Sequence, residues 1–330
     1  MLVTSWSIGL SICSLLALFL ILRSAYTAIR VLRFWDQSAD TPLQIRLESE
    51  IWLSSTLMEF GLFFQIFSLL LLVVAADSFA SLLPGAMCAT GSFLANSYGM
   101  KSLSLKLVSV FLYGFWILIH RLDIKSPHYP LVRLKNVYLL VLCPLLIADI
   151  SLQTLYLQGL HPDIITSCCG VVFSKPDVSI LGLSKSMASF TSMAFFYCGV
   201  FFLLLLMRKR FPFSDFLLAA GSALLFPAGL WIITTFVSPY VYAMPHHRCP
   251  FCLLHVEYNY VGYPLFLFLY LASFSGMGVA LLAGFGMYSD LETAIVKQQK
   301  LLRRVASWAL IFFLFLSLYY PIKYVVLGGE

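Results

Sequence analysis

Charged residues are scarce in this sequence: Asp, Glu, Lys and Arg together make up 11% of its 330 residues. A soluble domain carries about a quarter of charged residues, so the composition excludes a water-soluble globular protein. Several catalytic motifs are also missing, namely the P-loop, the Gly-rich dinucleotide-binding loop and the His-Glu-x-x-His motif of zinc proteases. The sequence therefore gives no support to nucleotide-driven transport or to metalloprotease chemistry.

Long apolar runs dominate instead, with 61% of the residues hydrophobic. A helix needs about 20 mostly apolar residues to cross a bilayer. No stretch alternates in the way that strands of a membrane β-barrel do, and no linker, internal repeat or soluble domain interrupts the runs. We predict an all-α polytopic membrane protein, a single domain over residues 1–330 with the lipid bilayer as its main partner. It has about eight transmembrane helices, centred on residues 5–22, 56–76, 104–119, 137–158, 187–207, 215–238, 263–285 and 305–320.

The distribution of basic residues predicts the orientation of these helices. Of the 21 Lys and Arg residues, 15 fall in the connections 21–50, 121–136, 208–212 and 288–304. Because Lys and Arg are retained on the cytoplasmic side, both termini should be extracytoplasmic. This scheme assigns Lys106 to the extracytoplasmic loops and helix ends. We expect a bacterial-type inner membrane, and we infer no nucleic-acid partner, since this asymmetry accounts for the net charge of +6.

Cysteines gather in the loops assigned to the outer face. They are Cys88, the adjacent pair Cys168 and Cys169, and the pair in His246-His247-Arg248-Cys249-Pro250-Phe251-Cys252. On an oxidising surface, thiols can take part in redox or metal chemistry. Adjacent cysteines form a strained ring when they bridge each other, so we expect Cys168 and Cys169 to find partners in other loops. The loop around Cys88 is poor in charge, and we expect it to pack into the mouth of the bundle.

The Cys249-Pro250-Phe251-Cys252 motif precedes the seventh apolar run, and we predict that it opens that helix. Free backbone N–H groups and the helix dipole would then lower the pKa of the Cys249 thiol and make it a better nucleophile. Pro250 suits the first turn of a helix, and Arg248 would bind a cofactor or stabilise the thiolate. The tetrapeptide is similar to the active-site motif of glutaredoxin-like enzymes, although the residues around it do not indicate their α/β fold.

The placement of these cysteines resembles that in membrane thiol oxidases of the DsbB and vitamin K epoxide reductase type. The resemblance implies that Cys249 and Cys252 form the pair beside a quinone, and that Cys168 or Cys169 acts with Cys88 as the shuttle. Those families have fewer spans and a different order of motifs. We therefore predict a membrane thiol–disulfide oxidoreductase, linked to a quinone, in which Cys249 attacks, Cys252 resolves the intermediate, and an extracytoplasmic thiol protein is the partner.

Two alternatives use the same loops. His246, His247, Cys249 and Cys252 are suitable ligands for copper or zinc, which favours a metal-binding or transport protein. Alternatively, the cysteines form structural disulfides in an accessory membrane subunit. Covalent attachment of a c-type haem would require His directly after the second cysteine, where the sequence has Leu253.

One carboxyl group lies well inside a predicted span. Asp149 is near Gln153 in the fourth run, and an ionised carboxylate at this depth is costly. We interpret Asp149 either as part of a proton or ion path, or as a protonated side chain that hydrogen-bonds to a neighbouring helix.

Overall fold

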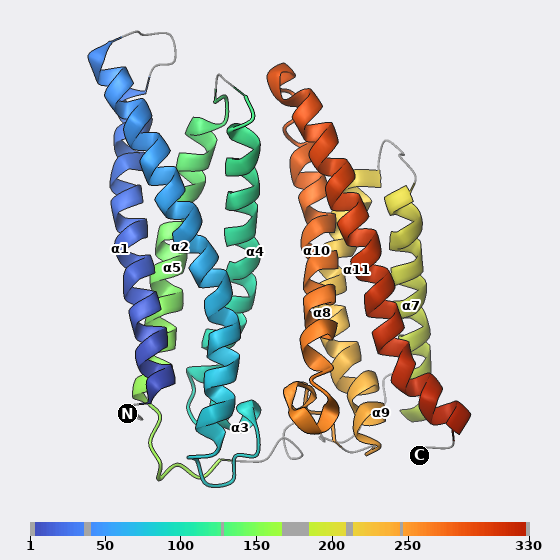
Figure 1. Cartoon of the computed structure of the whole chain (residues 1–330). Coiled ribbons are helices and arrows are strands. Elements are labelled where there is room, and N and C mark those ends of the chain that lie inside the picture. Colours follow the sequence, from blue (N-terminus) through green and yellow to red (C-terminus); the bar gives the residue numbers. More distant parts are fainter. Residues whose placement is uncertain are drawn as a thin grey trace. The chain divides into compact units, whose positions relative to one another are not determined.

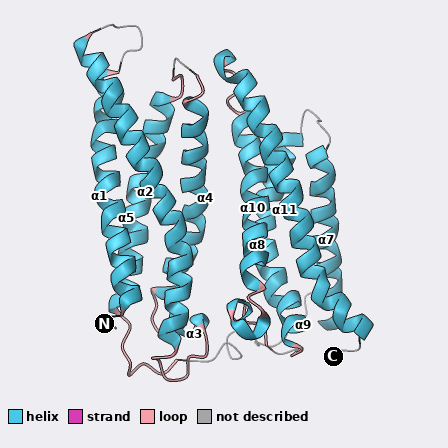
Figure 2. Cartoon of the chain, in the orientation of Figure 1, coloured by secondary structure: helices cyan, strands magenta, loops and turns pink. Residues whose placement is uncertain are grey.

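The computed structural model describes residues 4–35, 41–126, 129–166, 185–208, 214–244 and 247–327. All regular structure among these residues is helical (Figure 2). Within the described part of the chain, eight helices are long and apolar enough to span a membrane, which confirms the all-α prediction and indicates a multi-pass membrane protein. They are built from α1 (Ser5–Phe34), α2 (Pro42–Ala80), α4 (Gly99–Asp123), α5 (Val132–Gln158), α7 (Lys185–Arg208), α8 (Ser214–Ile232) with α9 (Ser238–Tyr242), α10 (Gly262–Ala283) and α11 (Glu292–Leu327).

The helices extend beyond the apolar runs that predict them. α1 has 30 residues and begins with a capping box, in which Thr4 and Ser7 bond to each other's backbone N–H groups. α2 has 39 residues, with Thr41 as its N-cap and Pro42 in its first turn. The sequence predicts a connection over 21–50, whereas the structure leaves only 35–41 outside these two helices. All four basic residues assigned to that connection, Arg23, Arg30, Arg33 and Arg46, are therefore helical.

Chain contacts divide the protein into two compact units. The first comprises residues up to Thr166 together with Tyr288–Ala294, and the second comprises Ser167–Met287 with Ile295–Glu330. Because such a division measures contacts and not independent folding, the single domain over residues 1–330 stays a prediction.

The first unit is a bundle of α1, α2, α4 and α5, in which α5 packs against α1 and α4 (Figure 1). Its apolar core includes Leu62, Trp116, Leu142 and Leu146. The chain between α2 and α4 contains the short helix α3 (Ala89–Leu94), which Figure 1 shows at the same end of this unit as the start of α1.

This connection packs against the segment that follows α5. The Thr166 N–H donates to the Pro84 carbonyl at 3.0 Å. Gly85 has a φ of +82°, and a Cβ there would lie 2.4 Å from the Thr166 carbonyl oxygen. Only glycine can therefore occupy this position without displacing the loop segment at Thr166.

The second unit contains α7, α8, α9, α10 and α11. α8 passes without a break through one π-helical turn, Ile233–Val237, into α9, and the Ser238 hydroxyl donates to the Ile233 carbonyl at 2.8 Å. Arg303 of α11 pairs with Asp215 of α8 and donates to the Leu206 carbonyl of α7 at 3.4 Å. This one buried guanidinium thus links three helices at their ends.

Candidate functional site

Two predicted site residues meet in the loop 243–261, which joins α9 to α10 in the second unit. The sulfur atoms of Cys249 and Cys252 lie within 4.8 Å of each other. Cys249 has no exposed surface, and Cys252 retains 9%. The loop therefore holds two sulfur atoms close together and largely away from solvent.

Tyr242, the last residue of α9, anchors this loop. Its hydroxyl donates to the Cys249 carbonyl. The rings of His247 and Tyr258 each meet the Tyr242 ring edge-on, with centroids 4.5 Å apart. Tyr242 is only 5% exposed, so an aromatic cluster fixes the backbone at the first cysteine of the motif.

The prediction that the motif opens the seventh spanning helix is wrong. Cys252 begins a three-residue 3-10 turn, Cys252–Leu254, and α10 begins only at Gly262. Asn259 and Tyr260 adopt left-handed backbone angles, which break the helix between the two elements. A turn this short has no appreciable dipole, so the predicted lowering of the thiol pKa by a helix N-terminus does not apply.

Gly262 explains how α10 can start so close to this turn. A Cβ at Gly262 would lie 2.9 Å from the Leu253 carbonyl carbon and 2.8 Å from the Leu254 side chain. The absence of a side chain lets the helix start pack directly against the residues that follow Cys252.

Outside the spanning helices, Tyr258 reports on the electrostatics of the loop. Partial burial raises the pKa of its hydroxyl above the ordinary value, and negative charge on Cys252 and on Glu257 raises it further. The Tyr258 ring is thus close enough to respond to the ionisation state of Cys252.

The remaining predicted residues are placed as follows. Cys88 is buried in the first unit, where it is the N-cap residue of α3. His247 contacts Tyr242, and Arg248 is partly buried beside Cys249. The predicted site residues Cys168, Cys169 and His246 lie outside the described residues.

No family model, curated protein or solved structure matches this chain. Its function has to be argued from its own residues.

The first unit contains a second candidate site, of which the sequence predicted Asp149 but not its partner Lys106. Lys106 is not at an outer end, as its place in the loop count implied; it lies inside α4 with no exposed surface. Its ammonium group is 3.0 Å from Asp149 Oδ2 on α5, and Asp149 is equally buried. On α2, the same ammonium group reaches Ser68 Oγ at 3.0 Å and Gln65 Oε1 at 3.4 Å.

A stripe of small and polar residues along α4 is the signal that could have revealed Lys106. These residues recur at the three- and four-residue spacing of one helix face, and all of them are buried: Gly99, Ser102, Lys106, Ser109 and Tyr113. A polar stripe in an apolar span faces other helices and not lipid, so a lysine within it requires a counter-charge. Asp149 is the acid that the structure supplies.

A second buried ion pair lies near the other end of the same two helices. Asp123 Oδ2 accepts from the Lys135 ammonium at 2.7 Å, and Asp123 Oδ1 accepts from the Leu131 N–H at 2.9 Å. The Lys135 carbonyl in turn accepts from the Trp116 indole N–H at 3.0 Å. Every oxygen of the Asp123 carboxylate therefore has a partner.

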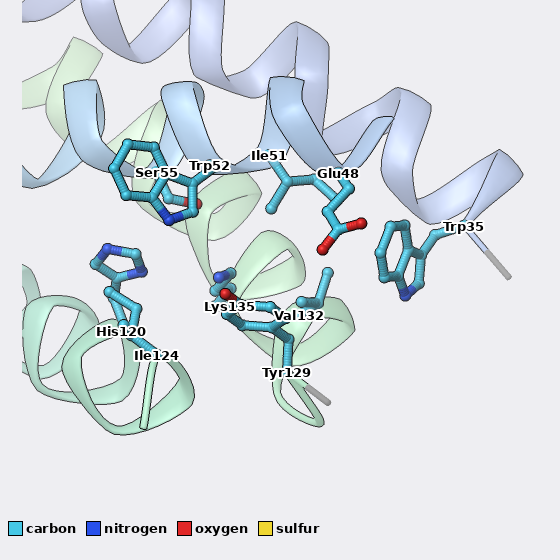
Figure 3. A pocket seen from close by; sticks show the side chains of 10 residues that line it. All are labelled: Trp35, Glu48, Ile51, Trp52, Ser55, His120, Ile124, Tyr129, Val132 and Lys135. Atoms are coloured by element: carbon cyan, nitrogen blue, oxygen red, sulfur yellow. The ribbon is translucent and has the colours of Figure 1, made fainter. Parts of the chain in front are cut away.

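A cavity of about 30 Å³ lies beside this second pair. Figure 3 shows Trp52, Glu48 and His120 around it, with Lys135 behind Tyr129. Nδ1 of the buried His120 has no hydrogen-bond partner. The volume suits one or two water molecules and is far below the several hundred Å³ of a cofactor pocket.

Proposed function

We propose that this protein is a membrane thiol–disulfide oxidoreductase, with Cys249 and Cys252 as the reacting pair. The observation that carries the proposal is the approach of the two sulfur atoms to within 4.8 Å in an aromatic-anchored loop. A Cys-x-x-Cys pair at this separation can alternate between dithiol and disulfide by small side-chain rotations.

The reaction is exchange with the disulfide of an external protein. One thiolate of the pair attacks a substrate sulfur, the substrate disulfide breaks, and a mixed disulfide forms as one substrate thiolate leaves. The other cysteine of the pair then attacks the mixed disulfide and releases the second substrate thiolate. Two electrons pass to the substrate, and the enzyme pair becomes a disulfide; the reverse sequence oxidises a substrate dithiol.

Burial changes the expected order of attack. The sequence predicts that Cys249 attacks first, but Cys249 has no exposed surface and Cys252 keeps some. An incoming disulfide reaches Cys252 more readily, so we place the mixed disulfide on Cys252 and the resolving step on Cys249.

The cellular setting and the relay rest on the sequence. The distribution of Lys and Arg supports extracytoplasmic termini in an inner membrane, with the loop 243–261 on the same face. The loops of Cys88, Cys168 and Cys169 are assigned to that face. When the pair has been reduced by oxidising a substrate dithiol, we propose that these residues are the shuttle that passes the two electrons onward to a quinone.

The reduction potential of the pair tests the proposal. The purified protein would be equilibrated in glutathione redox buffers, quenched, and its thiols counted with a mass tag. For an exchanging pair we expect a midpoint above about −270 mV, in the range of thioredoxin-like catalysts. A midpoint at or below about −300 mV would assign a structural disulfide and overturn the proposal.

Single variants identify the two roles. With oxidised glutathione as the probe, Cys249→Ser should accumulate a mixed disulfide on Cys252, whereas Cys252→Ser should accumulate much less. Cys198→Ser is the matched control, because Cys198 lies in the middle of α7, away from the loop. Zinc or copper that copurifies in stoichiometric amount with the wild type, and is lost from both loop variants, would replace this function with metal binding.

A further inference from the structure

The two buried acid–base pairs of the first unit differ in one respect. Both oxygens of Asp123 accept hydrogen bonds, whereas Asp149 accepts only at Oδ2. Asp149 Oδ1 is buried and has no partner. A buried carboxylate oxygen without a donor is costly and uncommon in folded proteins, so it calls for a physical explanation.

Lys106 cannot satisfy this oxygen. Its ammonium group has three N–H donors, and it faces three acceptors, on Gln65, Ser68 and Asp149. The cation is therefore saturated, and a donor to Asp149 Oδ1 has to come from elsewhere.

A second orphaned acceptor lies one turn along the same helix. The Gln153 side-chain amide donates to Ser14 Oγ on α1 at 2.9 Å, which leaves Gln153 Oε1 buried and without a partner. Residues four apart in a helix present their side chains on the same face. Both orphaned atoms are acceptors, and a water molecule or a hydronium ion is a donor small enough for a packed core.

We propose that this cluster is a proton-exchange site, at which a water held between Asp149 Oδ1 and Gln153 Oε1 carries protons to and from Asp149. A hydronium there gives one proton to the carboxylate, leaving a carboxylic acid and a water; the reverse step restores the charged pair. Lys106 is the fixed positive charge that makes the ionised state of Asp149 tolerable inside the span. The site lies in the first unit, whereas Cys249 and Cys252 belong to the second, and it does not depend on their chemistry.

An apolar core cluster separates Asp149 from the second buried ion pair. Asp149 and Lys135 are 14 residues apart on α5, or about 21 Å along the helix. Leu139, Leu142 and Leu146 fill that interval, together with Trp116, in one apolar core cluster.

The other groups that face the site are few. α4 contributes Lys106 and, two turns further, the buried hydroxyl of Tyr113. α2 contributes Gln65 and Ser68, and α1 contributes Ser14. Asp149 is thus the carboxylic acid among these described groups.

Infrared spectroscopy of the protein in lipid vesicles tests the proposal. Between about pH 9 and about pH 5, we expect the C=O stretch of a protonated carboxylic acid to appear and to shift in D2O. The band should be lost in Asp149→Asn and retained in Asp123→Asn, the matched control whose carboxylate is fully hydrogen-bonded. Gln153→Leu should slow the exchange with D2O while keeping the band.

Three results would overturn the proposal. The first is that no carboxylic acid band assigned to Asp149 appears over this pH range. The second is that the band appears but does not shift after hours in D2O, as expected of a sealed structural pair. The third is that Gln153→Leu exchanges as fast as the wild type. If Asp149→Asn does not fold, the Gln153→Leu comparison still decides the matter.

Discussion

Removal of the Lys106 ammonium group by Lys106→Met should destabilise the first unit severely. Methionine fills a similar length, so the change deletes the charge with little loss of volume. The variant leaves the Asp149 carboxylate, which has no exposed surface, without a counter-ion.

The size of the destabilisation depends on which partners of Lys106 keep other hydrogen bonds in the variant. Ser68 Oγ still donates to Gln65 Oε1 at 3.1 Å, so these two side chains satisfy each other after the change. The loss therefore falls on Asp149, and at about pH 9, where we expect its carboxylate to stay ionised, breaking the buried ion pair from one side should cost about 3–5 kcal/mol. In the double variant Lys106→Met with Asp149→Leu, no buried charge remains, and its stability should return to within about 1 kcal/mol of the wild type or exceed it.

The assay is reversible unfolding in mixed micelles, in which a denaturing detergent is titrated and helix content is followed by circular dichroism. Arg46→Met is the control: Arg46 pairs with Glu50 at 3.3 Å, but its side chain is 76% exposed. That change should cost less than about 0.5 kcal/mol. If Lys106→Met is no worse than Arg46→Met, or if the double variant is as unstable as Lys106→Met alone, the ion pair does not exist as described.

Three further predictions concern separate parts of the molecule. Gly85→Ala should lower the free energy of unfolding by about 1–3 kcal/mol in the same assay, because Gly85 has a positive φ and no space for a Cβ. Gly9→Ala is the control: Gly9 lies in a helix with no atom near its Cβ, so the free energy of unfolding should rise by up to about 1 kcal/mol. Tyr242→Phe removes the donor to the buried Cys249 carbonyl. A loss of about 1.4 kcal/mol in the free energy that keeps the loop closed should make alkylation of the Cys249 thiol in the reduced protein about tenfold faster. An unchanged rate would show that the hydroxyl does not hold the loop. The raised pKa of Tyr258 means that folding favours its neutral form, so the stability from this group is present below about pH 10 and is lost as the pH rises through the folded-state pKa. Ultraviolet titration of the wild type minus Tyr258→Phe measures that pKa, and a value at or below the ordinary one contradicts the burial.

Loop chemistry was harder to predict than the spans. The sulfur atoms of Cys249 and Cys252 lie within 4.8 Å of each other, but the chemistry predicted for them stays a prediction. The prediction of a helix start failed because the turn that begins at Cys252 ends at His255, whose backbone is extended, and left-handed residues at Asn259 and Tyr260 follow before α10. Single residues of this kind leave little trace in hydropathy. The anchoring role of Tyr242 was also missed, since tyrosines near a membrane interface are common and its contacts are made by folding of the loop.

The amino-acid sequence by itself determined the class of the protein and its spanning helices, because crossing a bilayer is a requirement on the length and polarity of each segment taken alone. Asp149 stood out for the same reason, as a charge inside an apolar run. Its partner did not: Lys106 and Asp149 are 43 residues apart, and only the packing of α4 against α5 brings them together. That packing also decides which oxygen of Asp149 is left without a donor, because hydrogen-bond partners on separate helices are fixed by their positions in space and not by their spacing along the chain.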